Sequence, residues 1–287
     1  MYVAMTDIGP LSSGNRTSLV PGFAPAVRSP WHDPAWHYII DLDGTLIRDG
    51  AAMPGAAALL EALHGRYAIV SNNSTDTAVS MARKLRKMGL VVAPAQLVLA
   101  GEMTVNWLWQ TSPGARVYLL GSPVLRRYAQ RVGCRLVEQN PDVVLLALDR
   151  AFNYRKLLLA VNVLRTGARL IVTNPDLSHP GGNGWRVPET GALLAAVLAC
   201  ADVRPVSIIG KPSDVLFREG LRRLRAKPAQ TLMIGDNPAT DAAGAVAMGM
   251  SYLLLGTGPE AEAETPAQLL ETWGTRRTHL HPDISSV

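Results

Sequence analysis

The sequence predicts an α/β protein in which a parallel-sheet core carries a second, inserted α/β domain. Two observations support this prediction. Short apolar runs alternate with helical patterns along most of the 287 residues, as expected of βαβ units. The runs end abruptly in polar residues, and the interval from Ser71 to Lys211 spans about 140 residues, far more than one crossover helix needs.

The composition narrows the class of protein. Apolar residues make up 48% of the chain, charged residues 18%, and the net charge is +5, which excludes wholesale disorder and a coiled coil. No apolar run approaches the ~20 residues of a membrane helix, and the start lacks a signal-peptide pattern. The basic residues fall at helical spacing, typical of solvated helix faces. We therefore expect no membrane or nucleic-acid partner.

The cysteines and the two ends of the chain add further expectations. Cys134 and Cys200 fit no metal-type spacing, so we expect no disulfide framework and a cytoplasmic protein. Residues 1–34 contain five prolines and no sustained apolar period, which predicts an N-terminal tail. Residues 275–287 are predicted to form a C-terminal tail.

Four apolar runs are predicted to form the strands of the core, because short runs of this kind suit strands buried on both faces. They lie at residues 38–40, 67–70, 206–209 and 231–234. Helical spacing predicts helices around Met81, Leu85 and Met88, and around Phe217 and Leu221. We assign residues 35–111 and 204–274 to this core.

The long interval has its own alternation and predicts an inserted domain over residues 112–203. Strands are expected at 116–120, 143–148 and 169–173, and helices at 157–164 and 193–199. An insertion at the carboxyl end of a parallel sheet would lie over the crevice where such sheets bind ligands.

Polar residues follow the core strands where each strand ends. They are Asp41, Asp43, Ser71, Lys211, Asp236 and Asp241. Because the carboxyl ends of parallel strands meet at one edge, we expect these side chains to converge. Crowded carboxylates repel one another, and Mg²⁺ with its preference for oxygen ligands would relieve the repulsion. A metal, a lysine and a hydroxyl donor together suit a phosphate group.

The stretch from Asp41 to Thr45 is the most specific part of this pattern. Asp41 and Asp43 lie two residues apart after a strand, so their side chains point to the same side. One can attack phosphorus as a nucleophile while the other serves as general acid for the leaving oxygen. Gly44 allows a sharp turn after the pair.

Four motifs make the chain resemble a known family. They are "YIIDLDGT", "VSNNST", "IIGKPSD" and "MIGDNPATD", in this order. Over residues 35–258 the chain resembles the haloacid dehalogenase-like superfamily. The stretches "LDRAFNYRKL" and "GARLIVTNPD" resemble its branch of 4-nitrophenyl, phosphoglycolate and pyridoxal phosphatases. The resemblance implies a Rossmann-like core with an α/β cap inserted between the second and third motifs.

The resemblance also implies roles for the two aspartates of the first motif. Asp41 would be the nucleophile that becomes an aspartyl phosphate. Asp43 would protonate the leaving group and then activate water, and its backbone carbonyl would contact Mg²⁺. An acid at position 43 favours ester hydrolysis over dehalogenation, because an alkoxide leaving group needs a proton and a halide does not.

The other three motifs are implied to bind phosphate and metal. Ser71 and the backbone at Asn72 would hold the phosphoryl oxygens, and Lys211 would neutralise the charge between nucleophile and phosphate. Asp236 would bind Mg²⁺ directly, and Asp241 directly or through water. The metal would thus contact Asp41, Asp43, Asp236 and Asp241.

Substrate specificity is expected from the cap. The residues that we expect to contact the part of the substrate beyond the phosphate are Asn174, Asp176, His179 and Arg186. Family members commonly have Pro-Gly-x-Gly where this chain has Pro188-Glu189-Thr190-Gly191. The departure adds a carboxylate near the expected substrate loop and leaves the substrate class open.

The function predicted from these features is a Mg²⁺-dependent phosphatase that hydrolyses a small phosphorylated metabolite through an aspartyl phosphate. Three alternatives stay open: a phosphotransferase that uses the same intermediate, a non-catalytic phospho-ligand binding protein, and an aspartate-phosphorylated signalling receiver. The paired aspartates and the long insertion argue against the last two. Caps in this branch often take part in dimerisation, so we expect a homodimer.

Overall fold

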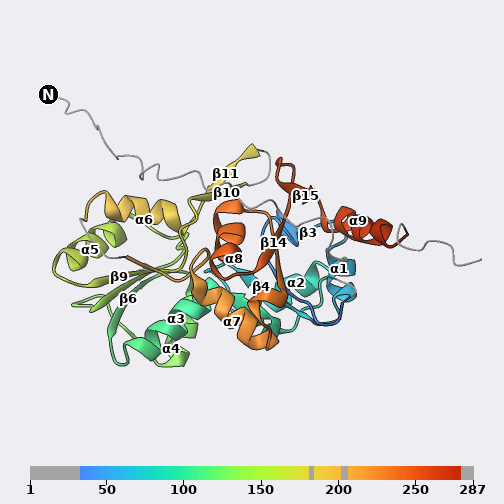
Figure 1. Cartoon of the computed structure of the whole chain (residues 1–287). Helices are drawn as coiled ribbons and strands as arrows, with labels where there is room; N and C mark the ends of the chain where they lie inside the picture. The colour runs from blue at the N-terminus through green and yellow to red at the C-terminus, as the bar shows by residue number, and fades with distance from the viewer. Residues whose placement is uncertain (1–32, 181–183, 202–205, 279–287) are drawn as a thin grey trace, which may run out of the picture.

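The computed structural model describes residues 33–180, 184–201 and 206–278. Two parallel sheets lie beside each other, each with helices packed on its faces (Figure 1). The α/β class and the inserted second sheet are therefore as predicted. Most of the predicted N-terminal tail and the predicted boundary between residues 203 and 204 lie outside the described residues. Among the described residues, no helix is long and apolar enough to cross a membrane.

The first sheet has the strand order β15-β14-β13-β1-β4-β5, and all of its pairs are parallel. Its strands are β1 (His37–Ile40), β4 (Tyr67–Ser71), β5 (Leu97–Leu99), β13 (Thr231–Gly235), β14 (Ser251–Leu255) and β15 (Ala261–Ala263). Strand β1 lies between β13 and β4. Residues that follow these three strands therefore meet at one edge, which we name the catalytic edge.

The helices of the first sheet come from both halves of the chain. They are α1 (Ala56–Ala62), α2 (Ala78–Lys87), α3 (Ala100–Thr111), α7 (Asp214–Leu224), α8 (Ala243–Ala247) and α9 (Pro266–Thr278). A short antiparallel flap, β2 (Ile47–Arg48) and β3 (Ala51–Ala52), precedes α1. Helix α9 runs to Thr278, so the prediction that the C-terminal tail begins at residue 275 was wrong.

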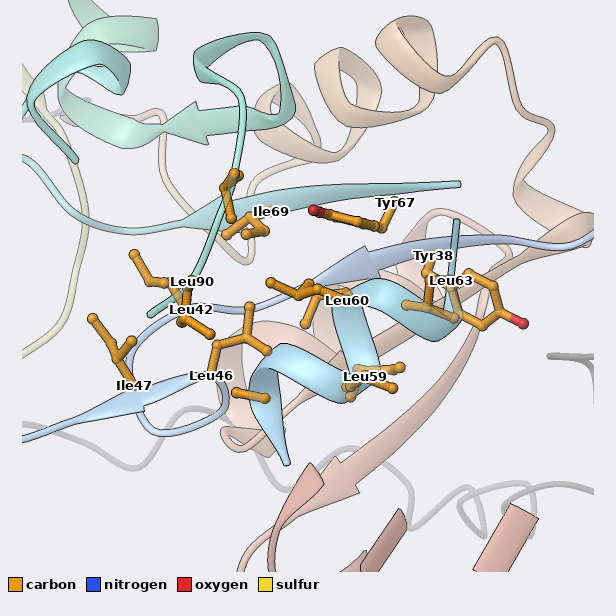
Figure 2. Close-up of a cluster of buried hydrophobic side chains, with 14 of the residues drawn as sticks. Tyr38, Leu42, Leu46, Ile47, Leu59, Leu60, Leu63, Tyr67, Ile69 and Leu90 are labelled. Atoms are coloured by element: carbon orange, nitrogen blue, oxygen red, sulfur yellow. The ribbon is translucent and has the colours of Figure 1, made fainter. Parts of the chain in front are cut away.

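Apolar side chains anchor the loop that carries the first motif. Leu42 and Leu46 are fully buried and pack in one cluster with Tyr38 of β1 and Leu59 of α1 (Figure 2). Burying each such side chain stabilises the fold by about 1.5–3 kcal/mol. The backbone N–H of Leu46 also donates to the Leu42 carbonyl at 2.9 Å. Because side chains alternate along an extended segment, anchoring Leu42 in the core directs Asp41 and Asp43 away from it.

The second sheet has the order β12-β9-β8-β6-β7, again all parallel. Its strands are β6 (Arg116–Leu120), β7 (Arg135–Leu136), β8 (Val143–Leu146), β9 (Arg169–Val172) and β12 (Val206–Ile208). Its helices are α4 (Pro123–Val132), α5 (Tyr154–Arg165) and α6 (Thr190–Leu198). A hairpin of β10 (Ser178–Pro180) and β11 (Arg186–Pro188) leaves this unit between β9 and α6.

The run at residues 206–209 was predicted to belong to the first sheet, and this prediction was wrong. Strand β12 pairs with β9 of the second sheet, with Ser207 opposite Ile171. An apolar run of this length suits any strand buried on both faces, so its pattern could not identify the sheet. We therefore propose that the inserted domain extends through Ile209 and that the chain returns to the first sheet immediately before Lys211.

A continuous apolar cluster joins the two sheets. It contains Ile39, Val70 and Phe217 from the first unit and Leu119, Leu145 and Ile171 from the second. Helix α3 packs on α4, and α7 packs on β4. The inserted unit is thus packed against the first sheet and not merely joined to it by two linkers.

Candidate active site

The catalytic edge holds three carboxylates and a lysine. Asp41, Asp236 and Asp241 each offer a carboxylate oxygen, and these oxygens all lie within 4.8 Å of one another. Lys211 Nζ donates to Asp41 Oδ1 at 2.5 Å and to Asp241 Oδ1 at 2.7 Å. The structure therefore brings together four of the residues that the sequence placed at this edge.

The charges of this cluster do not cancel. Burial raises the pKa of Asp41; Lys211 lowers it, but Asp241 and Asp236 raise it again, so the pKa lies well above the ordinary value. Burial and then the charge of Asp241 raise the pKa of Asp236 to about 6. Burial acts to lower the pKa of Lys211, but Asp241 and Asp41 outweigh it, and the pKa rises. Lys211 thus keeps its charge, and the excess of negative charge favours binding of a further cation.

Asp241 is held by a local irregularity of the chain. It lies in a π-helical turn, Pro238–Ala242, a feature frequent at functional sites. Asp241 Oδ2 accepts from the backbone N–H of Asp236 at 3.2 Å and of Asn237 at 3.1 Å. A Cβ at Gly235 would lie 2.3 Å from the same oxygen, so the close approach of Asp241 to the strand end requires glycine there.

Gly44 does more than permit the predicted turn. Its φ is +92°, a conformation that favours glycine. A Cβ at this position would lie 2.1 Å from Asp236 Oδ2. The glycine of the first motif therefore makes room for a carboxylate of the fourth motif, which no local pattern in the sequence indicates.

Asp43 lies apart from the carboxylate cluster. Its side chain reaches solvent, although the protein crowds its carboxylate. This burial raises its pKa, against the lowering effects of Lys211 and of the Ser71 hydrogen bond. Ser71 Oγ donates to Asp43 Oδ2 at 3.4 Å. A carboxyl group beside the cluster, holding its proton more tightly than usual and open to water, has the properties of a general acid.

Asn72 links the catalytic edge to the inserted unit. Its Oδ1 accepts from the Lys211 backbone N–H at 2.8 Å, and its Nδ2 donates to the Lys211 carbonyl at 3.2 Å. The same Nδ2 donates to Asp176 Oδ2 at 3.0 Å. The side chain thus positions Lys211, a role that the sequence did not reveal because its partners are more than 100 positions away.

Asn174 was predicted to contact substrate, and the structure places it elsewhere. It is 1% exposed. Its Nδ2 donates to the Asn72 carbonyl at 2.9 Å and to Thr190 Oγ1 at 3.2 Å. Asn174 is therefore a buried tie between the two units, whereas Asp176, two residues later, reaches the site through Asn72.

The hairpin separates two further predicted specificity residues. His179 pairs with Val187 and Pro180 pairs with Arg186 across the antiparallel ladder, so His179 and Arg186 lie on opposite faces. His179 is close enough to lower the pKa of Asp43. Arg186 donates to Ser178 Oγ at 3.2 Å on the other face. The structure thus brings His179 to the site but not Arg186.

Glu189 is a site residue to which the sequence assigned no role. Its Oε1 lies 2.7 Å from His179 Nδ1. Burial raises the pKa of Glu189; His179 lowers it, and the charges of Asp176 and Asp43 raise it. The only signal in the sequence was the departure from Pro-Gly-x-Gly at this position.

Comparison with known proteins identifies the family of this chain. The family of haloacid dehalogenase-like hydrolases matches residues 38–135, and a HAD-hydrolase-like family matches residues 208–286. The chain is 30% identical to a dihydroxyacetone phosphatase of Corynebacterium glutamicum, covering 87% of this chain and 90% of that protein. It is 32% identical to the 5'-nucleotidase YutF of Bacillus subtilis, covering 77% and 87%.

A solved structure shows the same architecture. The 4-nitrophenylphosphatase of Thermotoga maritima matches with a TM-score of 0.77 at 29% identity, covering 85% of this chain and 98% of that one. The two proteins are thus similar in both sequence and fold over most of their length. The protein belongs to the haloacid dehalogenase-like hydrolases.

Proposed function

We propose that this protein is a phosphatase that hydrolyses small phosphate monoesters through an aspartyl phosphate on Asp41. The observation that carries the proposal is the separation of two kinds of carboxylate: Asp41 within a lysine-bound cluster, and Asp43 beside it and open to solvent. The names of the relatives, which include dihydroxyacetone phosphatase and 5'-nucleotidase, support the same class of reaction.

Mg²⁺ is the metal that the cluster would hold. Asp41, Asp236 and Asp241 supply hard oxygen ligands at suitable separations, and their excess negative charge fits a divalent cation. A bound Mg²⁺ would neutralise charge on the phosphoryl oxygens. The side chain of Asp43 is outside this cluster, so its contribution through the backbone carbonyl stays a prediction.

The reaction divides into two displacements at phosphorus. A carboxylate oxygen of Asp41 attacks phosphorus, the ester P–O bond breaks, and the leaving oxygen takes the proton of Asp43. Asp43, now ionised, takes a proton from water, and the resulting hydroxide attacks phosphorus. Phosphate leaves, and the Asp41 carboxylate is restored. The ammonium of Lys211 lowers the repulsion between Asp41 and the phosphate dianion in the first displacement.

Water is the acceptor that the geometry favours. Transfer to another alcohol would require that water be kept from the aspartyl phosphate, whereas the Asp43 side chain reaches solvent. A binding protein without catalysis would have no need of an acid beside the nucleophile. The cytoplasmic location and the homodimer expected from the sequence stay predictions.

The proposal is tested on the full chain with a panel of phosphate esters that includes 4-nitrophenyl phosphate. Phosphate release should require Mg²⁺, stop in excess chelator and return when Mg²⁺ is restored. Asp41→Asn should lower kcat by at least about 10³-fold, since it removes the covalent step. The exposed Asp49, in the turn between β2 and β3, gives the matched control Asp49→Asn.

Two results would contradict the proposal. One is activity of Asp41→Asn above about 1% of the wild-type value while its circular dichroism shows that the variant is folded at the assay temperature. The other is the absence of phosphate release from every ester in the panel.

A further inference from the structure

We propose that Glu189, paired with His179, makes the site selective for phosphate esters whose leaving group carries no negative charge. This inference rests on the proposed phosphatase function and concerns only the part of the substrate beyond the phosphate. It begins from the contact between Glu189 and His179, whose Oε1 and Nδ1 atoms lie 2.7 Å apart.

The pair is built by the backbone around it. His179 lies in β10, and Glu189 directly follows β11, which pairs with β10. The Glu189 N–H donates to the Leu177 carbonyl at 3.0 Å, which extends the ladder by one bond. With the backbone fixed in this way, His179 Nδ1 and Glu189 Oε1 lie 2.7 Å apart.

Helix capping does not explain the Glu189 side chain. Glu189 is the N-cap residue of α6, a position where a side chain commonly accepts from the first turn of the helix. It makes no such bond, and its carboxylate lies against His179 instead. The Glu189 side chain therefore contacts His179 on one face of the hairpin and does not cap the helix.

Asp176 adds a second carboxylate at the same place. Its carbonyl accepts from the Gly191 N–H at 2.7 Å, which holds it beside the start of α6. The Asp176 side chain, bound to Asn72, raises the pKa of Glu189, and His179 lowers the pKa of Asp176. Asp176, His179 and Glu189 thus form one group of interacting charges near Asp43.

The net charge of Asp176, His179 and Glu189 determines which leaving groups can bind beside them. Without Glu189, a histidine near the site could offer a positive charge to a carboxylate or a second phosphate of the substrate. Glu189 Oε1 lies against His179 Nδ1 and offsets a positive charge on the ring. The carboxylate of Asp176 then makes the net charge of the three side chains negative. An anionic leaving group would be repelled there, whereas a hydroxylated, uncharged one can donate hydrogen bonds to these carboxylates.

Two esters of similar size test the inference: 2-phosphoglycolate, with an anionic leaving group, and 2-hydroxyethyl phosphate, with a neutral one. Each competes with 4-nitrophenyl phosphate, so an inhibition constant is obtained whether or not it is hydrolysed. Wild type should bind the neutral ester more tightly. Glu189→Gln keeps a hydrogen-bonding group but removes the charge, and should shift the ratio of the two constants toward 2-phosphoglycolate by about tenfold.

The His179→Gln variant should shift the ratio the other way, because it leaves Glu189 without its counter-charge. A merely structural role for the pair would move both variants in the same direction. Glu61→Gln, on the exposed face of α1, changes the net charge equally and should leave the ratio unchanged.

Several outcomes would overturn the inference. One is a wild-type preference for 2-phosphoglycolate, and another is an unchanged ratio in Glu189→Gln. In both cases hydrolysis of 4-nitrophenyl phosphate would leave the proposed function intact. If no ester is hydrolysed at all, the proposed function fails, and this inference fails with it.

Discussion

The catalytic edge and the β10–β11 hairpin hold their charges in different ways. At the catalytic edge, Asp41, Asp241 and Lys211 are 5%, 1% and 2% exposed, and Lys211 bonds both carboxylates. At the hairpin, His179 and Arg186 are exposed; His179 contacts Glu189, and Arg186 donates to Ser178. The proposed site therefore combines a buried end with bonded charges, where we expect phosphate to bind, and an exposed end, where we expect the rest of the substrate.

The two ends should respond differently to substitution. Removing one member of a buried ion pair costs about 3–5 kcal/mol, because the remaining charge stays buried without its partner. An exposed pair contributes about 0–1 kcal/mol. Changes at the catalytic edge should thus affect both folding and catalysis, whereas changes in the hairpin should alter substrate preference at little cost in stability.

Among substitutions that keep every charged side chain of the site, the largest effect is expected at Gly44. An alanine there would collide with Asp236 Oδ2, so the Asp236 carboxylate must shift from its position in the carboxylate cluster. Gly44→Ala should weaken Mg²⁺ binding by about 100-fold, the upper range for disturbing a residue that positions a metal ligand. Isothermal titration calorimetry with Mg²⁺ measures this directly.

Gly50→Ala is the matched control for that change. Gly50 also has a positive φ, +76°, but a Cβ there would meet nothing within 4 Å. Both variants pay the backbone cost of alanine in this conformation, and only Gly44→Ala disturbs Asp236. Equal losses of Mg²⁺ affinity in the two would show that the close contact with Asp236 has no role in metal binding.

The next effect concerns pH. The pKa of Asp236 rises from 3.8 to about 6 in the folded, metal-free protein, so the folded state binds more protons than the unfolded state between these values. The free energy of unfolding of metal-free wild type should therefore fall, relative to Asp236→Asn, as pH rises from about 4 to 6.

Mg²⁺ competes with the same proton, so its affinity should rise over this window, by up to about tenfold per pH unit. Urea unfolding and calorimetry at several pH values measure both quantities. A stability difference between wild type and Asp236→Asn that stays constant from pH 4 to 6 would count against the raised pKa.

The smallest effects separate two residues of the inserted unit. Asp176→Ala removes a partner of Asn72 and should lower kcat/KM for the preferred ester by about tenfold, the size of one lost charge-assisted hydrogen bond. Arg186 lies on the opposite face of the hairpin from His179. Arg186→Ala should therefore lower kcat/KM for the same ester by less than about threefold. Steady-state kinetics decide between them, and a larger loss for Arg186→Ala would reverse our assignment of the two faces.

The sequence predicted features that depend on neighbouring residues and missed those that depend on distant ones. Asp41 and Asp236 were expected at one edge because each follows an apolar run of the first sheet, and their convergence follows from parallel strands. Lys211 reaches the same edge although the run before it, β12, belongs to the second sheet. The sheet to which β12 belongs was not predictable, because an apolar run of this length fits a buried strand of either sheet. The opposite faces of His179 and Arg186 become apparent only when both residues are known to lie in paired strands.

The site residues separated by long stretches of chain were the hardest to predict. Asn72 contacts Lys211 and Asp176, which are 139 and 104 positions away. The burial of Asn174 depends on Thr190 and on the Asn72 backbone. No composition or spacing reports such contacts, since tertiary packing alone creates them.

The position of β12 limits how a substrate can enter. Strand β12 ends at Ile208 in the second sheet, and Lys211, three positions later, bonds Asp41 at the first. Three residues span at most about 10 Å, and Gly210 is already bonded to Thr173 at 2.8 Å. This segment acts as a short tether: swinging the whole inserted unit outward would pull the lysine from its aspartates. A substrate therefore has to reach Lys211 without such a movement of the inserted unit.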